Sequence, residues 1–232
     1  MQQDPQVSSA PDMMAAGRGW VAAAPLILLL AGASVLAARE VARQWRIARV
    51  EGAAAAVDGL SPAIALQRLA EAERDCGGGC GPRALVASGA ARALIAGRLT
   101  AGPPREQLAA RAGQDLRSAI AEQPQSGEGW AWLAVAESEQ SGEGHRRQAV
   151  AALEHSYGLA PFLRDLALWR TRFAGSDWTS LDAATRQRAV DEVARLSLID
   201  PGQAEDAELA FSDPAAGQAL DQRMAHRGVM AR

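Results

Sequence analysis

The sequence predicts an all-α fold, with a membrane-spanning helix near the amino terminus and a helical-repeat domain after it. Three observations lead to this prediction. Alanine, the best helix former, dominates the 232 residues. No stretch alternates apolar and polar residues over a convincing length, as a half-buried strand would. Three prolines are each preceded by a similar spacing of small and apolar residues, which is typical of a repeat built from pairs of helices.

The first predicted element is a transmembrane helix over residues 19–38. It follows a polar, proline-containing segment over residues 1–18 that we expect to be disordered. The span holds no charge across twenty positions, and at about 1.5 Å per residue it covers about 30 Å, the thickness of a hydrocarbon core. Trp20 and Trp45 flank it, at positions that suit contact with lipid headgroups. The alternative is a cleaved signal peptide, but the long acidic leader and the full membrane length favour an anchor.

Two signals disagree about the side of the membrane on which the carboxyl-terminal part lies. The positive-inside rule places it in the cytoplasm, because four arginines follow the span: Arg39, Arg43, Arg46 and Arg49. Cys76 and Cys80, however, lie in a glycine-rich turn, DCGGGCGP, where flexibility lets two thiols meet. Disulfides persist in the periplasm and rarely in the cytosol; two idle thiols are the alternative. We expect a single-pass bacterial inner-membrane protein with a periplasmic carboxyl-terminal domain.

Turn residues divide the rest of the chain into three segments: juxtamembrane helices and the cysteine–glycine turn over 39–81, helical repeats over 82–201, and an acidic linker with a C-terminal helix over 202–232. Helix starts are expected at Pro62 and Pro82, because proline fits the first helical position. Another helix is expected to begin at about Arg105. The acidic stretch from Asp200 to Asp213 is expected to be irregular.

The predicted repeats close at Pro124, Pro161 and Pro201, at intervals of 37 and 40 residues. Small or apolar residues stand twelve, eight and five positions before each proline: Ala112, Leu116 and Ala119; Ala149, Leu153 and Ser156; Ala189, Val193 and Leu196. Small residues let two helices cross closely, and the proline ends the second helix of each pair. The alternative is an irregular helical bundle in which periodic alanine and leucine only reflect composition.

This spacing resembles the tetratricopeptide repeat. The second helix of that repeat carries small, large and small residues before a closing proline, and the first carries a tryptophan, a leucine and a small residue. Trp130-Ala-Trp-Leu133-Ala134 is similar to the first-helix pattern. The resemblance is good over 125–161 and partial over 82–124 and 162–201, and it implies a TPR-like α-solenoid. Glu137 departs from the family, since it stands at an aromatic position.

Residues 110–201 also resemble small single-pass accessory proteins of bacterial exopolysaccharide and O-antigen loci. The resemblance rests on QPQSGEGWAWLAVAE, on AVAALEHSYGLAP, and on the following helix with Arg170 and Arg172. Those proteins are associated with polymerisation or export of the polymer. The resemblance implies a membrane-anchored, protein-binding scaffold whose partners are envelope polysaccharide assembly or export subunits. The alternative function is a general periplasmic chaperone or a secretion and assembly factor.

No catalytic, cofactor-binding or metal-binding residue is predicted, so we do not expect an enzyme. The three histidines, at 145, 155 and 226, are scattered along the chain. Cys76 and Cys80 have no second ligand pair at the spacing of a zinc site, which leaves a thiol-redox or metal enzyme as a distant alternative. A net charge of −3 gives no electrostatic reason to bind nucleic acid.

The expected partner-binding surface consists of tryptophans and arginines in the repeat region: Trp130, Trp132, Arg146, Arg147, Trp169, Arg170 and Arg172. Tryptophan is enriched among the residues that dominate binding energy. Trp130 and Trp132 cannot share a helix face, so we expect one inside and the other exposed. The arginines, together with Arg164, are candidates for an acid-binding rim, with a solvated charged face as the alternative.

Overall fold

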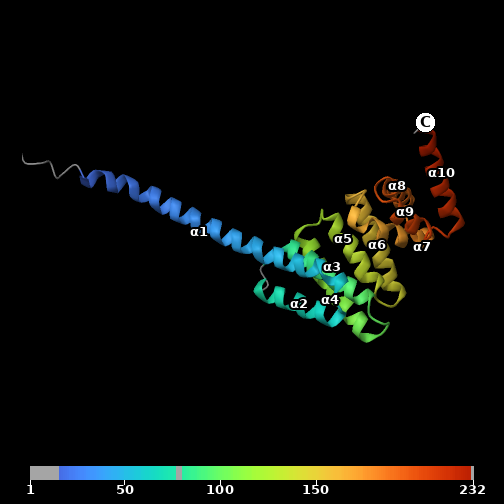
Figure 1. The fold of residues 1–232 in the computed structure, drawn as a ribbon, viewed down its shortest axis with the longest axis horizontal. Coiled ribbons are helices and arrows are strands. Elements are labelled where there is room, and N and C mark those ends of the chain that lie inside the picture. Colours follow the sequence, from blue (N-terminus) through green and yellow to red (C-terminus); the bar gives the residue numbers. More distant parts are fainter. Residues whose placement is uncertain (1–15, 77–79, 231–232) are drawn as a thin grey trace, which may run out of the picture. The chain divides into compact units, whose positions relative to one another are not determined.

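The computed structural model describes residues 16–76 and 80–230, with side chains described for 28–76 and 80–225. Helices connected by turns and loops make up this part of the chain, and it contains no strand, so the all-α prediction is confirmed (Figure 1). The α-helices are α1 (Ala16–Ala55), α2 (Pro62–Cys76), α3 (Pro82–Gly97), α4 (Pro103–Glu122), α5 (Gly127–Ser138), α6 (Glu143–Leu159), α7 (Ala167–Ser176), α8 (Ala183–Ile199), α9 (Pro201–Glu208) and α10 (Pro214–Met230). The 3₁₀-helices are η1 (Val57–Gly59), η2 (Arg164–Leu166) and η3 (Trp178–Ser180).

The chain divides into two compact units after Trp45. In the first unit, α1 exposes a series of large apolar side chains that are each more than half exposed: Leu28, Leu29, Leu30, Val35, Leu36, Val41 and Trp45. Within the part of the chain that the structure describes, no helix has both the length and the apolar character needed to span a membrane. Residues 1–15 of the predicted amino-terminal segment, and the side chains of residues 19–27 of the predicted span, lie outside the described residues.

In the second unit, consecutive helices pack in pairs. Helix α3 packs on α4, α5 packs on α6, and α7 packs on α8. The pairs are stacked, since α5 contacts both α3 and α4, and α8 contacts α6. Helix α2 packs on α3, α9 contacts both α7 and α8, and α10 packs on α8. Stacked helix pairs are compatible with the predicted helical repeat, whereas membership of the tetratricopeptide family stays a prediction.

The three helices that close the predicted repeats end in the same way. Helices α4, α6 and α8 each stop two residues before the proline, and the residue between has a non-helical backbone, with φ from −133° to −148° and ψ from 73° to 93°. Its N–H donates at 2.8 Å to the carbonyl five positions before the proline: Gln123 to Ala119, Ala160 to Ser156, and Asp200 to Leu196. A proline disfavours the helical conformation in the residue before it. The positions of the prolines therefore explain where these helices stop.

All nine residues that the proline spacing selects are buried, and none is more than 1% exposed. Two apolar cores hold the second unit together. The first joins the end of α1 to α2, α3 and the beginning of α4, and the second runs from α3 to α10. Since α3 and α4 contribute to both cores, this helix pair connects the end of α1 and α2 to the helices from α5 onward.

The acidic stretch that was predicted to be irregular contains helix α9. Asp200 caps this helix by accepting a 3.1 Å hydrogen bond from the backbone N–H of Gln203, and Pro201 occupies a first-turn position. Both features satisfy or remove N–H groups that lack partners at the start of a helix. Two alanines of α9 are buried in addition. The prediction of irregular structure from Asp200 to Asp213 was therefore wrong over this helix.

Candidate functional site

The tryptophans predicted to bind a partner lie in different surroundings. Trp130 and Trp132 are both half-buried, so the expected division into one buried and one exposed ring is not observed. Trp130 packs against His155, with ring centroids 4.6 Å apart, and its indole N–H donates to the Pro124 carbonyl at 3.0 Å. Trp132 instead lines a groove between α3 and α5. Trp130 lines a different pocket, formed with α4 and α6, so the two tryptophans do not contribute to one binding surface.

The remaining predicted residues of this surface are also separated from one another. Trp169 stacks on Phe173, with ring centroids 5.2 Å apart. Arg146 forms a 2.6 Å ion pair with the buried Asp177. Arg146 is exposed, as are Arg147, Arg164 and Arg172. Because Arg146 already has a carboxylate partner, the structure does not assemble the predicted arginines into one free acid-binding rim.

Arg170 is buried, which contradicts its predicted place on that rim. Its side chain is 0% exposed, and its Nε lies 3.2 Å from Oε2 of Glu192. The guanidinium carbon lies 3.8 Å from the centroid of the Tyr157 ring, and Nη1 donates to the Ala160 carbonyl at 2.9 Å. A carboxylate, a carbonyl and an aromatic face replace part of the water around the guanidinium, while Nε and Nη2 form no hydrogen bond within the described residues.

Glu192 accepts the other hydrogen bonds of this cluster. The Tyr157 hydroxyl donates to Oε2 at 2.7 Å, and the Leu163 N–H donates to Oε1 at 3.1 Å. Burial raises the pKa of Glu192 to about 7, because the loss of hydration outweighs the attraction of Arg170 and the hydrogen bonds that favour the carboxylate. Burial also raises the pKa of Tyr157. The cluster joins α6, α7 and α8 in the interior, so we assign it to stability.

The sequence contains a signal that would have located this cluster. Glu192 lies next to Val193 and three residues after Ala189, on the face of α8 that the proline spacing predicts to be buried. A carboxylate on a buried face requires a cation or hydrogen-bond donors. Arg170 is a candidate for that cation. Considering Arg170 and Glu192 together predicts a buried ion pair.

Glu137 is also buried, at the position where the tetratricopeptide resemblance expects an aromatic side chain. It is 1% exposed, and its carboxylate pairs with Arg117 and lies 2.7 Å from Nδ1 of His145. Gln140 donates to the same carboxylate at 3.3 Å. Polar contacts therefore connect α4, α5 and α6 at this position, where the family pattern has the packing of a ring.

The groove beside Trp132 is bounded by the end of α1, by α3 and by α5, and has a volume of about 610 Å³. Its apolar lining residues include Val86, Ala87, Ala90, Leu94 and Trp132. At its edge, Glu51 and Arg83 form a 2.8 Å ion pair. Glu128 and Asp165 are exposed and form no hydrogen bond or ion pair with any described residue. An apolar centre with a polar rim is the usual composition of a protein-binding surface.

The sequence indicated this groove only in part. Val86, Ala90 and Leu94 recur at intervals of four residues, which predicts an apolar helix face. That pattern is typical of a face buried in the core. The structure leaves Val86 and Leu94 partly exposed instead, because α5 packs beside this face of α3 without covering it.

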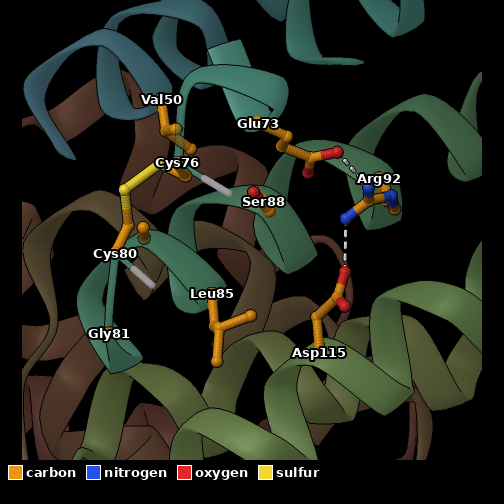
Figure 2. Close-up of a pocket in the computed structure, with 10 residues that line it drawn as sticks. Val50, Glu73, Cys76, Cys80, Gly81, Leu85, Ser88, Arg92 and Asp115 are labelled. Atoms are coloured by element: carbon orange, nitrogen blue, oxygen red, sulfur yellow. Dashed lines mark hydrogen bonds and ion pairs between the residues drawn. A yellow bond between two sulfur atoms is a disulfide. The ribbon is translucent and has the colours of Figure 1, made fainter. Parts of the chain in front are cut away.

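The disulfide between Cys76 and Cys80 forms one wall of a second, smaller pocket, which has a volume of about 220 Å³ (Figure 2). Cys76 is the last residue of α2, and Cys80 lies just before α3, with their Cα atoms 5.3 Å apart. Both residues are buried. No group of three or more metal-ligating side chains occurs among the described residues.

Arg92 lies on the opposite side of this pocket, between two carboxylates (Figure 2). Its Nη2 donates to Glu73 Oε2 at 2.6 Å, and its Nη1 donates to Asp115 Oδ2. Burial raises the pKa of Asp115; the charge of Arg92 opposes this shift, and the charge of Glu73 adds to it. Sequence reasoning assigned Glu73 to a solvated helix face and did not connect it with Arg92 and Asp115, because the three residues come from α2, α3 and α4 and meet only in the folded protein.

The scattered histidines do not form a site with these groups. His145 contacts Glu137, and His155 packs on Trp130. The side chain of His226 lies outside the residues whose side chains are described. In the comparisons with known proteins, no family model, no curated protein and no solved structure matches this chain.

Proposed function

We propose that this chain is a membrane-anchored scaffold that binds a protein partner in the groove between α3 and α5, in the assembly or export of a bacterial envelope polysaccharide. The groove is the observation that carries the proposal. It combines a partly exposed apolar lining with two carboxylates, Glu128 and Asp165, that have no partner among the described residues. Stacked helix pairs commonly present such surfaces to extended peptides or to helices of other proteins.

A TPR-like architecture is part of the proposal. The three helix ends at Pro124, Pro161 and Pro201 share one backbone conformation and one hydrogen bond, which supports a common repeat unit. Contacts of α5 with both helices of the preceding pair support stacking of successive units. The polysaccharide context rests on the sequence resemblance over residues 110–201.

The proposed anchor is residues 19–38 of helix α1. Large apolar side chains on α1 are exposed, and a bilayer would remove them from water. Trp45 is 68% exposed, which suits an indole ring among lipid headgroups. The disulfide supports a periplasmic location for the second unit, because such bonds persist in oxidising compartments.

Site-specific crosslinking in the native bacterium tests the proposed partner. A photoreactive amino acid at Leu94, within the groove, should crosslink the full-length chain to subunits of a polysaccharide polymerase or exporter. The same amino acid at the exposed Gln187, on α8, is the control and should not. Crosslinks from Leu94 to many unrelated proteins would favour the chaperone alternative, and an equal pattern from both positions would contradict binding in the groove.

The Trp132→Ala variant provides a quantitative check. Removing a half-buried tryptophan from the groove should weaken binding of the crosslinked partner by about tenfold or more. Reporter fusions after Ala55 and at the carboxyl terminus test the membrane orientation. Periplasmic activity of both fusions is expected, and cytoplasmic activity would overturn the envelope function.

A further inference from the structure

The pocket beside the disulfide has one apolar half and one polar half. Val50, Ala84, Leu85 and the disulfide contribute the apolar half. Ser88, Glu73, Arg92 and Asp115 contribute the polar half. In the view of Figure 2, Ser88 lies between the disulfide and the Glu73–Arg92–Asp115 chain. A cavity divided in this way matches a ligand with one charged end and one apolar end.

Ser88 lines the pocket and has no hydrogen-bond partner in the described part of the chain. The residue is only 5% exposed. Serine in a helix commonly donates to the carbonyl four residues earlier, and several serines of this chain bond to their own helix in a similar way, Ser118 among them. The Ser88 oxygen is not one of the fully buried polar atoms that lack a partner, so it is accessible from the pocket and offers an unused hydrogen-bonding group there.

The charges around Ser88 do not balance. Arg92 is the one cation among the residues that line the pocket, and it pairs with both Glu73 and Asp115. The pocket therefore carries one excess negative charge, on side chains that are less than a third exposed. The second carboxylate oxygens, Glu73 Oε1 and Asp115 Oδ1, accept no hydrogen bond from any described residue. Partly buried charges are poorly screened by salt, so a cation bound here would be attracted more strongly than at the open surface.

We propose that this pocket binds a small organic cation, namely a primary ammonium on a short apolar chain. An ammonium has three donors and no acceptor, which matches the Ser88 hydroxyl oxygen and the two unused carboxylate oxygens. The apolar chain lies against Val50, Leu85 and the disulfide. The volume of about 220 Å³ is below the usual range for drug-sized ligands, about 300–1,000 Å³. The site therefore selects small amines, and its net charge rejects anions. This proposal stands independently of the partner-binding groove.

Three probes of equal length test the proposal on the full-length chain in lipid nanodiscs: n-butylammonium, n-butanol and butyrate. Calorimetric or NMR titration should show saturable binding of n-butylammonium, with a Kd of about 1 mM or lower. The alcohol and the carboxylate should bind at least about tenfold more weakly. Equal affinity for the three probes, or no saturable binding of n-butylammonium, overturns the proposal.

Four variants locate the binding in the pocket. Asp115→Asn and Ser88→Ala should each weaken n-butylammonium binding by about tenfold, whereas Ser118→Ala, on the exposed side of α4, should leave it unchanged. Leu85→Phe fills the apolar half and should abolish binding without removing a charge. Each variant is first checked for unchanged helicity by circular dichroism. Wild-type affinity in both Asp115→Asn and Leu85→Phe would show that the amine binds elsewhere and would refute the site.

Discussion

Replacing Arg170 by methionine removes the cation from a cluster that water does not reach. Arg170 and Glu192 are both 0% exposed, with Nε and Oε2 3.2 Å apart. At about pH 8 Glu192 is ionised in the native protein, since its pKa is about 7. The folded Arg170→Met protein must therefore either bury a carboxylate that has lost its cation, or protonate this carboxylate at a pH above its pKa. Either route destabilises the folded state.

The size of the effect follows from this geometry. Removing one partner of a buried ion pair costs about 3–5 kcal/mol. This cost already includes the contact between the guanidinium and the Tyr157 ring, at 3.8 Å, and the hydrogen bond to the Ala160 carbonyl, because the same substitution removes them. Glu192→Gln removes the carboxylate charge and keeps one oxygen, which can accept from Tyr157 or from Leu163 but not from both, because the two donate to different oxygens of Glu192. The double variant, Arg170→Met with Glu192→Gln, therefore contains no unpaired charge and should cost about 2 kcal/mol or less.

Urea unfolding followed by far-ultraviolet circular dichroism measures these differences in a double-mutant cycle. We expect a coupling energy between Arg170 and Glu192 of about 2 kcal/mol or more. The cost of Arg170→Met should also be smaller at about pH 5 than at about pH 8, because protonation neutralises Glu192 at low pH. A cost below about 1 kcal/mol at about pH 8, or additive single variants, would refute the interpretation of the cluster as a buried ion pair.

Three further predictions follow from burial and packing. Burial raises the pKa of Glu192 from 4.5 to about 7, so the folded state holds this proton more tightly than the unfolded state does. The resulting stability is full below about pH 4.5 and is lost as the pH rises through about 7, by up to about 3 kcal/mol. Urea unfolding of Glu192→Gln should lack this loss. If the free energy of unfolding of Glu192→Gln depended on pH as that of the wild type does, the assignment to Glu192 would be contradicted. Leu153→Ala, at a fully buried repeat position, should cost about 2–5 kcal/mol in urea unfolding, whereas Leu198→Ala, at a site 73% exposed, should cost less than about 0.5 kcal/mol. Gly89→Ala places a methyl 2.5 Å from a leucine side chain of α4 and should lower stability by about 1–3 kcal/mol. A Cβ at Gly144 meets no atom within 4 Å, so Gly144→Ala should not destabilise, and equal thermal midpoints for these two glycine variants would be inconsistent with close packing of α3 on α4.

The proline spacing predicted the repeat helices because its causes are local. A proline restricts the backbone of the residue before it and cannot continue the ladder of helix hydrogen bonds. Pro124, Pro161 and Pro201 therefore fix three helix ends in the folded protein. The small and apolar residues before them recur at helical spacing, so their common burial was also predictable from the sequence.

The failures of sequence reasoning concern residues whose surroundings are formed by distant segments. Arg170 was predicted to be exposed because arginine usually is. It is buried because Tyr157 on α6 and Glu192 on α8 meet around it. The irregular linker was predicted from acidic composition, but the Asp200 cap and contacts with α7 and α8 stabilise helix α9.

The sequence by itself determined the all-α class, the helix ends at the prolines and the identity of most buried repeat positions, because chain stiffness and helical periodicity act within a few residues. The partly exposed face of α3 beside Trp132, the unpaired hydroxyl of Ser88 and the excess charge around Arg92 were decided only by the tertiary structure. Each depends on how side chains from two or three helices pack together. Such packing sets which polar groups find partners and which remain available to a ligand.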